Sequence, residues 1–299
     1  MSRSLSYIHL KTTVNFTNLK TLTINGEPTS TTITCTAGDG HSAGIVLDNI
    51  TDTVTLNNLR QTFCGSRVIV NFDRIYDETY SKILSSALTI VHCHDMELEE
   101  LIIERSRGNG LTIFNLQGGR VYIKSSIFID NELPSEYINA TEPVYGGSGV
   151  CILLGKFLQG QYSPMTIQFD NCTFRNNTAH TEHYNLGQTL TGYGRGGGAY
   201  VLIDSGFADV HILFLGCKFI ANHAFIGGGL SINIHGRINR ETSNVTVEIE
   251  DSLFKHNGCS NHSVHSGFGG GVHFAFNTFL EGTGIVNCHY LVRLSLIHI

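Results

Sequence analysis

Phe174-Arg175-Asn176-Asn177 opens the stretch that decides the fold, and Gly196-Gly197-Gly198-Ala199-Tyr200 closes it after a variable insert. Three more segments repeat this plan of Phe-x-x-Asn, an insert and a glycine cluster. They are Phe128-Ile129-Asp130-Asn131 with Gly146-Gly147-Ser148-Gly149-Val150, Phe219-Ile220-Ala221-Asn222 with Gly227-Gly228-Gly229-Leu230, and Phe254-Lys255-His256-Asn257 with Gly269-Gly270-Gly271-Val272. Self-similarity of this kind is typical of solenoids, so the repeat indicates the fold class before any single element does.

The residue types in the repeat fit a stack of β coils. Equivalent residues of neighbouring coils lie about 4.8 Å apart, so inward Phe side chains stack and inward Asn side chains form an amide ladder. Glycine before a strand permits positive φ and a close approach of the next coil. We therefore expect one buried column made of Phe128, Phe174, Phe219 and Phe254. A parallel column at a turn should contain Asn131, Asn177, Asn222 and Asn257.

Short runs of alternating apolar and polar residues connect these markers. In residues 245–250, Val and Ile alternate with Thr and Glu, which is the period of a half-buried strand. Residues 1–125 lack Phe-x-x-Asn but keep such runs, as in residues 53–56. The clearest departure is the stretch 74–88, which is expected to form a short helix or a loop inserted between coils.

We predict an all-β protein, a right-handed parallel β-helix (solenoid), that forms a single domain over residues 1–293. Residues 1–125 are expected to form regular coils, and residues 126–293 to form Phe-x-x-Asn and Gly-rich coils with loop inserts. Residues 294–299 are expected to be a non-native tail, because they resemble a translated sequencing adapter. Neither end shows the amphipathic cap that a repeat stack needs, so we expect a fragment that lacks its caps.

The pairing of Phe-x-x-Asn with a Gly-Gly-Ala-type cluster resembles the repeats of the chlamydial polymorphic membrane proteins, and more broadly the pectin-lyase-like β-helix proteins. The Cys-x-Phe step, seen at Cys172-Thr173-Phe174 and Cys217-Lys218-Phe219, is similar to that of uncharacterised β-helix proteins of simple animals. The four units cover residues 120–290 or so. The resemblance implies a surface-exposed adhesive region, and it does so by analogy of fold.

Composition indicates a β-rich extracellular or cell-surface protein. Charged residues make up 15% of the chain, against about 25% in an average soluble protein, so the surface must depend on Ser, Thr, Asn and Gly. The net charge of −6 comes with no basic stripe, which argues against nucleic-acid binding. The sequence has no apolar stretch long enough to span a membrane and does not open on a signal peptide. Seven Asn-x-Ser/Thr acceptors fit a glycoprotein.

The eight cysteines follow the repeat rather than a zinc-site spacing. Cys35, Cys64 and Cys93 stand 29 residues apart, which predicts matching places on successive coils. Cys172 and Cys217 share the Cys-x-Phe step, so they should lie one above the other. Two alternatives stay open for such columns: stacked free thiols that act as small buried hydrophobes, or disulfides between coils.

A carbohydrate-active enzyme, a polysaccharide lyase or glycoside hydrolase of the pectin-lyase-like class, is the alternative function. Asn71-Phe72-Asp73 fits one of the three polygalacturonase-type segments, but the sequence has no Asp-Asp pair and no Gly-His-Gly. Glu97 with Glu99, and Glu248 with Glu250, have the strand spacing that a pair of hydrolytic carboxylates needs, although outward acidic residues show the same alternation. No residue is assigned a catalytic, cofactor-binding or metal-binding role, and no cofactor is expected.

The favoured function is a non-catalytic scaffold for recognition or adhesion, whose partner is a glycan or a cell-surface protein. Loops on a rigid scaffold carry binding because they vary without disturbing the core. The four inserts, residues 132–145, 178–195, 223–226 and 258–268, should emerge from one edge. The candidate binding residues on that edge are Tyr137, Tyr145, His180, His183, Tyr184, Tyr193, His262 and His265.

Overall fold

The structure is a computed structural model, which describes most of the chain in fourteen ranges. These are residues 7–10, 14–27, 31–35, 44–64, 66–72, 80–114, 119–133, 147–154, 164–179, 194–204, 209–237, 243–259, 269–279 and 286–298. Within these ranges the chain forms strands and turns and no helix. None of this part of the chain therefore offers a long apolar helix that could cross a membrane.

The strands form three sheets, which we name A, B and C. The fifteen strands of sheet A are β1 (Tyr7–Leu10), β3 (Thr21–Asn25), β4 (Thr32–Cys35), β6 (Thr53–Asn57), β7 (Arg60–Thr62), β10 (Asp95–Glu99), β11 (Ile102–Glu104), β13 (Gly119–Lys124), β14 (Ile127–Ile129), β17 (Met165–Asp170), β18 (Thr173–Arg175), β21 (Asp209–Leu215), β22 (Lys218–Ile220), β25 (Ser243–Lys255) and β28 (Val286–His298).

Sheets B and C are smaller. The nine strands of sheet B are β2 (Val14–Thr17), β5 (Ile45–Asp48), β8 (Ser66–Phe72), β9 (Tyr80–Val91), β12 (Asn109–Phe114), β16 (Val150–Leu154), β20 (Ala199–Asp204), β24 (Leu230–Arg237) and β27 (Val272–Phe279). The four strands of sheet C are β15 (Glu132–Leu133), β19 (Thr178–Ala179), β23 (His223–Ala224) and β26 (Gly258–Cys259).

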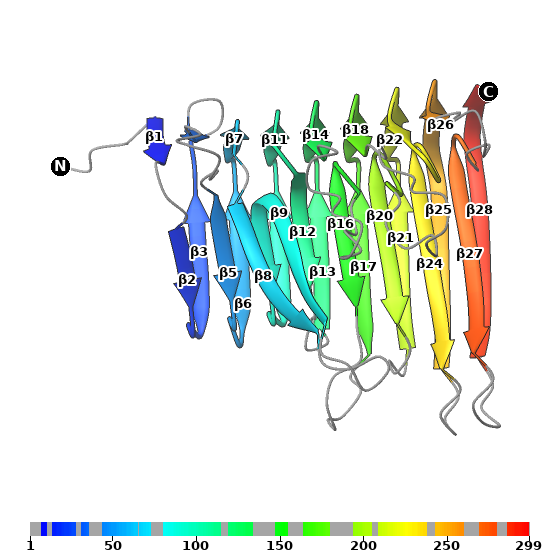
Figure 1. The fold of residues 1–299 in the computed structure, drawn as a ribbon, viewed down its shortest axis with the longest axis horizontal. Helices are drawn as coiled ribbons and strands as arrows, with labels where there is room; N and C mark the ends of the chain where they lie inside the picture. The colour runs from blue at the N-terminus through cyan, green and yellow to red at the C-terminus, as the bar shows by residue number, and fades with distance from the viewer. Residues whose placement is uncertain are drawn as a thin grey trace.

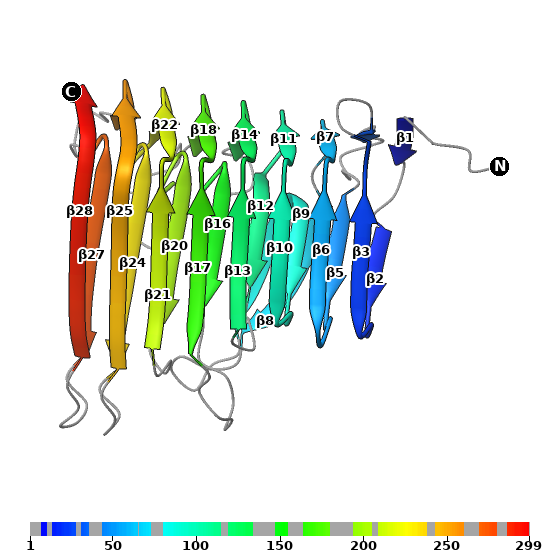
Figure 2. The same ribbon diagram turned by 180° about the vertical axis from the view of Figure 1, so that it is seen from behind.

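The three sheets make a parallel β-solenoid. Each coil visits sheet B, then the long strands of sheet A, then its short strands, and successive coils stack along one axis from the N-terminus to the C-terminus (Figure 1). Figure 2 shows the long strands of sheet A on the opposite side from sheet B, with the short strands above both. The all-β, parallel part of the predicted fold is thus confirmed.

One strand pair breaks the parallel pattern. β8 runs antiparallel to β9, and Ser66 pairs with Ser86 at one end of this hairpin and Phe72 with Tyr80 at the other. The expectation of a short helix or loop over residues 74–88 is wrong from Tyr80 onward, because these residues belong to β9. The β-branched and aromatic residues of the two strands favour an extended backbone.

The four repeat phenylalanines form the predicted column. Phe128, Phe174, Phe219 and Phe254 come from successive strands of sheet A, and each side chain is at most 3% exposed. Their rings stack nearly parallel, with centroid separations of 5.4, 4.5 and 4.6 Å along the column. A second interior pair, Phe169 and Phe214, stacks at 4.9 Å. Stacked rings and aliphatic side chains therefore form the core of the C-terminal half together.

The four repeat asparagines form the second predicted column. Asn177 is fully buried, and its Nδ2 donates to Oδ1 of Asn222 at 3.0 Å and to the carbonyl of Phe128 at 2.9 Å. Its Oδ1 accepts from Nδ2 and from the backbone N–H of Asn131, at 3.0 and 3.1 Å. The same pattern continues from Asn222 to Asn257. The amides of Asn131, Asn177 and Asn222 thus each tie their coil to both neighbouring coils.

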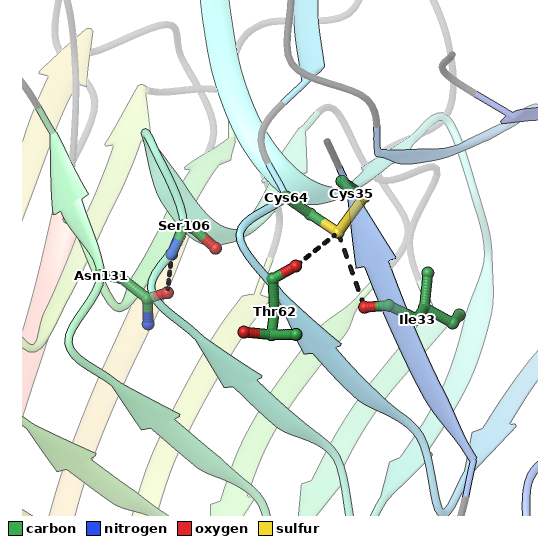
Figure 3. Close-up of a disulfide and its surroundings, with 6 residues drawn as sticks. All are labelled: Ile33, Cys35, Thr62, Cys64, Ser106 and Asn131. Carbon is green, nitrogen blue, oxygen red and sulfur yellow. Dashed lines mark hydrogen bonds between the residues drawn. A yellow bond between two sulfur atoms is a disulfide. The ribbon is translucent and has the colours of Figure 1, made fainter. Parts of the chain in front are cut away.

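A disulfide stands at the same corner of the first coils. Cys35 and Cys64 are bonded, with their Cα atoms 4.8 Å apart, and both are buried (Figure 3). The next coil places Ser106 beside Cys64, and the backbone N–H of Ser106 donates to Oδ1 of Asn131 at 3.0 Å. One corner column therefore begins as a disulfide and ends as an asparagine ladder.

The prediction that Cys93 continues the Cys35–Cys64 column is wrong. Cys93 lies beyond Val91, which pairs with Asp48, so it stands beside Ile50 at the turn between sheets B and A. The hairpin of β8 and β9 lengthens this coil, so equal spacing in sequence no longer means equal position in space. Cys93 is a buried free thiol, and burial raises its pKa to about 11.

Cys172 and Cys217 do lie on adjacent coils, as predicted. The strands that follow them pair Thr173 with Lys218, and the two thiols interact side by side. Both are fully buried and free. Burial, followed by the neighbouring Cys172, raises the pKa of Cys217 well above its ordinary value. Both alternatives for the cysteines therefore occur: Cys172 and Cys217 are stacked free thiols, and Cys35 and Cys64 form a disulfide.

The glycine clusters allow the coils to approach. A Cβ on Gly198 would lie 2.5 Å from the carbonyl oxygen of Gly229 and 2.9 Å from the ring of Phe219. Gly196, two residues earlier, has a φ of 59°. Both the close approach and the left-handed turn exclude larger residues. Strand β28 continues the pairing with β25 to the end of the described chain, including residues 294–298.

Candidate functional site

The eight candidate residues of the insert edge lie outside the described residues. Tyr137, Tyr145, His180, His183, Tyr184, Tyr193, His262 and His265 all fall in the stretches 134–146, 180–193 and 260–268. What the structure does describe is where each insert begins and the strand that follows it. The four strands of sheet C form the first two residues of the inserts, and β16, β20, β24 and β27 follow the inserts, each set paired in register.

Polar side chains line the outer face of sheet A. Along its long strands buried and outward residues alternate, and the outward ones change in kind from coil to coil. β3 and β6 present Thr and Asn, whereas β10 presents Asp95, Glu97 and Glu99. β13 presents Arg120, Tyr122 and Lys124 directly beside them.

We name as the charged patch the outward residues of β10 and β13 together with Asp170 at the end of β17. Lys124 Nζ lies 3.0 Å from Glu99 Oε1, and the hydroxyl of Tyr122 donates to Asp170 at 3.0 Å. The guanidinium of Arg120 lies over the Tyr122 ring at 4.9 Å. The acidic outward residues of β10 thus lie beside the basic and aromatic outward residues of β13, and opposite charges on adjacent strands stabilise a sheet.

Two groups of the patch have shifted pKa values. The pKa of Tyr122 is raised, first by partial desolvation and then by the hydrogen bond to the Asp170 carboxylate. The pKa of Lys124 is raised, because its ammonium is paired with Glu99. Both shifts favour the protonated groups that donate to carboxylates. The patch therefore presents a neutral phenol and a cation to solvent.

Two of the four carboxylates that the sequence singled out have a cationic or imidazole neighbour. Glu99 pairs with Lys124, and Glu248 Oε1 lies 3.1 Å from Nε2 of His211 on the preceding coil. Both histidines beside Cys93 also lie near carboxylates, since Nδ1 of His92 is 3.1 Å from Asp48 and Nδ1 of His94 is 3.3 Å from Asp95. No three His, Cys, Asp or Glu side chains within the fourteen described ranges are placed to hold a metal ion.

Sequence reasoning missed the basic half of the charged patch. Residues 119–124 alternate Arg, Tyr and Lys with small or apolar residues, and that period could have placed the three polar side chains on one face. Their acidic partners on β10 could not be assigned to them, because the 25-residue offset between these strands depends on the length of the intervening coil.

The outer face of sheet B is a second apolar layer. Val91, Phe114, Leu153 and Leu202 occupy one outward column there, and each is buried. Polar outward residues follow at the C-terminal coils, where Nδ2 of Asn233 donates to the hydroxyl of Tyr200 at 3.1 Å. Continuous apolar runs such as residues 150–154 are the sequence signal of strands buried on both faces. From β9 to β20 this face is therefore buried, whereas the outward side chains of β10 and β13 on sheet A are exposed or partly exposed.

No family model, curated protein or solved structure matches the chain.

Proposed function

We propose that this chain is a non-catalytic extracellular or cell-surface scaffold, a right-handed parallel β-helix, that recognises a glycan through the outer face of sheet A. Right-handedness is supported by the general preference of parallel β connections for that hand. The observation that carries the proposal is the charged patch. Its side chains are solvent-facing, held in register by the coils, and paired with one another across adjacent strands.

The chemistry of the patch suits polar ligands. Lys124 and Glu99 are each a little over 40% exposed, so both remain accessible to a ligand although they contact each other. Tyr122 offers a ring and a hydroxyl, and Gln168 on the next strand adds an amide at the same register. Aromatic rings and planar polar groups at fixed spacing are the usual elements of sugar binding.

The pairing of charges favours binding over hydrolysis. Glycosidic cleavage needs two carboxylates on either side of the bond, one of them protonated and the other ionised. In the patch, Glu99 contacts the Lys124 ammonium and Asp170 accepts from the Tyr122 hydroxyl, so each carboxylate already has a partner on β13 and the two are not placed on either side of a free gap. A carbohydrate-active enzyme therefore stays the second candidate, supported by the number of carboxylates on this face rather than by their arrangement.

The Cys35–Cys64 disulfide supports the proposed compartment. Structural disulfides persist in oxidising surroundings such as the cell exterior and are rare in the cytosol. A buried disulfide between two coils is useful to a protein that works outside the cell, where refolding is not assisted.

The test is a binding measurement on the folded chain produced without glycans in bacteria under oxidising conditions. The chain is applied to a glycan panel and to cell surfaces, beside Tyr122→Ala and Arg120→Ala variants. The matched control is Thr55→Ala, which alters the same outward register two coils away. We expect the patch variants to weaken glycan binding at least tenfold and the control to leave it unchanged.

Three outcomes would count against the proposal. Equal binding by the patch variants and the control would move the site away from sheet A. Binding to cell surfaces that survives removal of their glycans would replace the glycan by a protein partner. Release of shorter glycans by the parent chain would favour the enzyme. Shortening the 178–195 insert to the length of its 223–226 counterpart tests in the same assay whether the insert edge takes part.

A further inference from the structure

The described asparagines that begin N-glycosylation acceptor sequences differ in burial from the asparagines of the core. Asn-x-Ser/Thr sequences begin at Asn15, Asn49, Asn139, Asn171, Asn176, Asn244 and Asn261. Of these, the five that the structure describes are all exposed or partly exposed, namely residues 15, 49, 171, 176 and 244. None of the buried asparagines, which are residues 109, 131, 177, 222 and 233, begins such a sequence. The contrast is sharpest between neighbours, since Asn176 is an outward acceptor and Asn177 is an inward rung of the ladder.

We propose that Asn171 and Asn176 carry N-linked glycans. The proposal rests on the extracellular location contained in the proposed function, and it goes beyond that function by assigning a covalent modification to two turns of one coil. Asn171 lies in the turn that joins β17 to β18, and Asn176 lies in the turn that joins β18 to β19. Both turns belong to the row of short strands above the long strands in Figure 2.

The local backbone directs these two side chains outward. Asn171 and Asn176 adopt left-handed φ values of 51° and 53°, a conformation that Asn tolerates better than most residues. The residue after each one, Cys172 or Asn177, is fully buried, so the turn aims the preceding side chain at solvent. An attached glycan can therefore extend from the surface without displacing any part of the core.

The amides of these two residues make no side-chain hydrogen bond within the part of the chain that the structure describes. Among the described contacts, neither Asn171 nor Asn176 donates a side-chain hydrogen bond. By contrast, Nδ2 of Asn49 donates to Asn18 at 2.7 Å, and Nδ2 of Asn244 donates to Asp209 at 2.9 Å. A glycan replaces one hydrogen of Nδ2, so it would compete with these bonds at Asn49 and Asn244 but not at the two turns.

The transfer has a simple balance. The Nδ2 nitrogen attacks the anomeric carbon of an oligosaccharide carried on a lipid pyrophosphate. A carbon–nitrogen bond forms, the bond between the anomeric carbon and the pyrophosphate oxygen breaks, and the lipid pyrophosphate leaves. The proton lost from Nδ2 passes to a base of the transferase. The hydroxyl two residues on, from Thr173 or Thr178, completes the acceptor sequence.

The experiment supplies a heterologous secretion leader, so its result does not depend on the native compartment. The chain is expressed in a eukaryotic cell that N-glycosylates, and also translated with microsomes, which report occupancy without requiring export. Peptide mass mapping before and after N-glycosidase treatment identifies the modified residues. The variants are Asn171→Gln, Asn176→Gln and Thr173→Ala, and Thr173→Ser is the matched control that keeps the acceptor sequence.

We expect both peptides to be glycosylated, with one glycan lost in each Gln variant and in Thr173→Ala, and none lost in Thr173→Ser. Removing the glycans from the folded protein should leave its thermal midpoint essentially unchanged, since neither side chain packs against the core. Translocated chain with unmodified Asn171 or Asn176 would refute the proposal for that residue. Glycosylated chain that fails to fold, while the double Gln variant folds, would refute the outward geometry. Because the glycan-binding test uses bacterial protein, either proposal can fail while the other stands.

Discussion

Neighbouring coils are linked in different ways at the two ends of one corner column. In the first coils, Cys35 and Cys64 tie two neighbouring coils with a covalent bond. In the C-terminal coils, Asn131, Asn177, Asn222 and Asn257 tie four coils with amide hydrogen bonds that run from each coil to the next. The comparison teaches that a disulfide closes one pair of coils and stops, whereas an amide has donors and an acceptor and can continue the column.

Ser106 lies between the disulfide and the asparagine ladder, and it can form neither. Ser106 follows Cys64 in the column and its backbone N–H donates to Asn131, while its own buried Oγ has no hydrogen-bond partner among the described residues. A single hydroxyl cannot replace the two donors and two lone pairs of an amide. The interior column beside it changes in the same place, from Gln61 and Ile103 to the stacked Phe128. We expect the halves to differ in which perturbation unfolds them.

The largest effect should come from the ring stack of the C-terminal half. Phe219→Ala removes a fully buried ring that stacks on Phe174 and Phe254, and should lower the free energy of unfolding by about 3–5 kcal/mol. Phe63→Ala is the control, because Phe63 is 47% exposed and should cost about 0.5 kcal/mol or less. Chemical denaturation measures both. Equal losses would mean that the stack is not the core of this half.

The disulfide should come next, and its effect should be confined to the N-terminal half. Replacing Cys35 and Cys64 by Ser removes a constraint on a 29-residue separation, worth about 3 kcal/mol. Coils of a solenoid contact only their neighbours, so amide exchange should accelerate in residues 14–64 and stay slow in residues 164–259. Reducing agent should have no further effect on the double variant. Uniform acceleration along the chain would contradict independent halves.

Breaking the asparagine ladder should destabilise the C-terminal half, by less than loss of the ring stack or of the disulfide. Asn177→Ala leaves the amides of Asn131 and Asn222 without their partner inside the core, and should cost about 2–3 kcal/mol. The matched control is Asn57→Ala, which removes a similar amide contact to Asn25 at 3.1 Å on the solvent side. That change should cost about 0.5 kcal/mol or less, because water replaces the bond. If both cost the same, burial does not explain the ladder.

The smallest effect should come from the charged patch and should depend on pH. The folded pKa values of Tyr122 and Lys124 are raised, so their contribution is complete below the unfolded values of about 10 and is lost as pH rises through the folded ones. Thermal melts at about pH 8 and 10.5 should show a smaller alkaline loss for Tyr122→Phe than for the parent, by about 1 °C, since the patch is exposed. If the parent and Tyr122→Phe lost the same melting temperature at alkaline pH, the hydrogen bond from Tyr122 to Asp170 would not contribute to stability.

The sequence by itself determined the all-β class, the parallel coils and the two columns of Phe and Asn. The physical reason is that a repeat places the same residue type at the same point of every coil, so the contacts of one residue are with its own copies. Phe219 stacks on Phe174 because both occupy the position three residues before an inward Asn. The Cys172–Cys217 adjacency followed from the same register.

Only the tertiary structure decided features that depend on where unlike segments meet. Equal spacing suggested that Cys93 continues the Cys35–Cys64 column, yet the hairpin of β8 and β9 moves it to another corner. The neighbours of Lys124 and Tyr122 come from coils 25 and 48 residues away, and no repeat marks those offsets. Coil length sets which residues stack, and insert length is free to vary because it costs little entropy. Sequence period therefore gives the columns, while the register between coils of unequal length is a property of the folded stack.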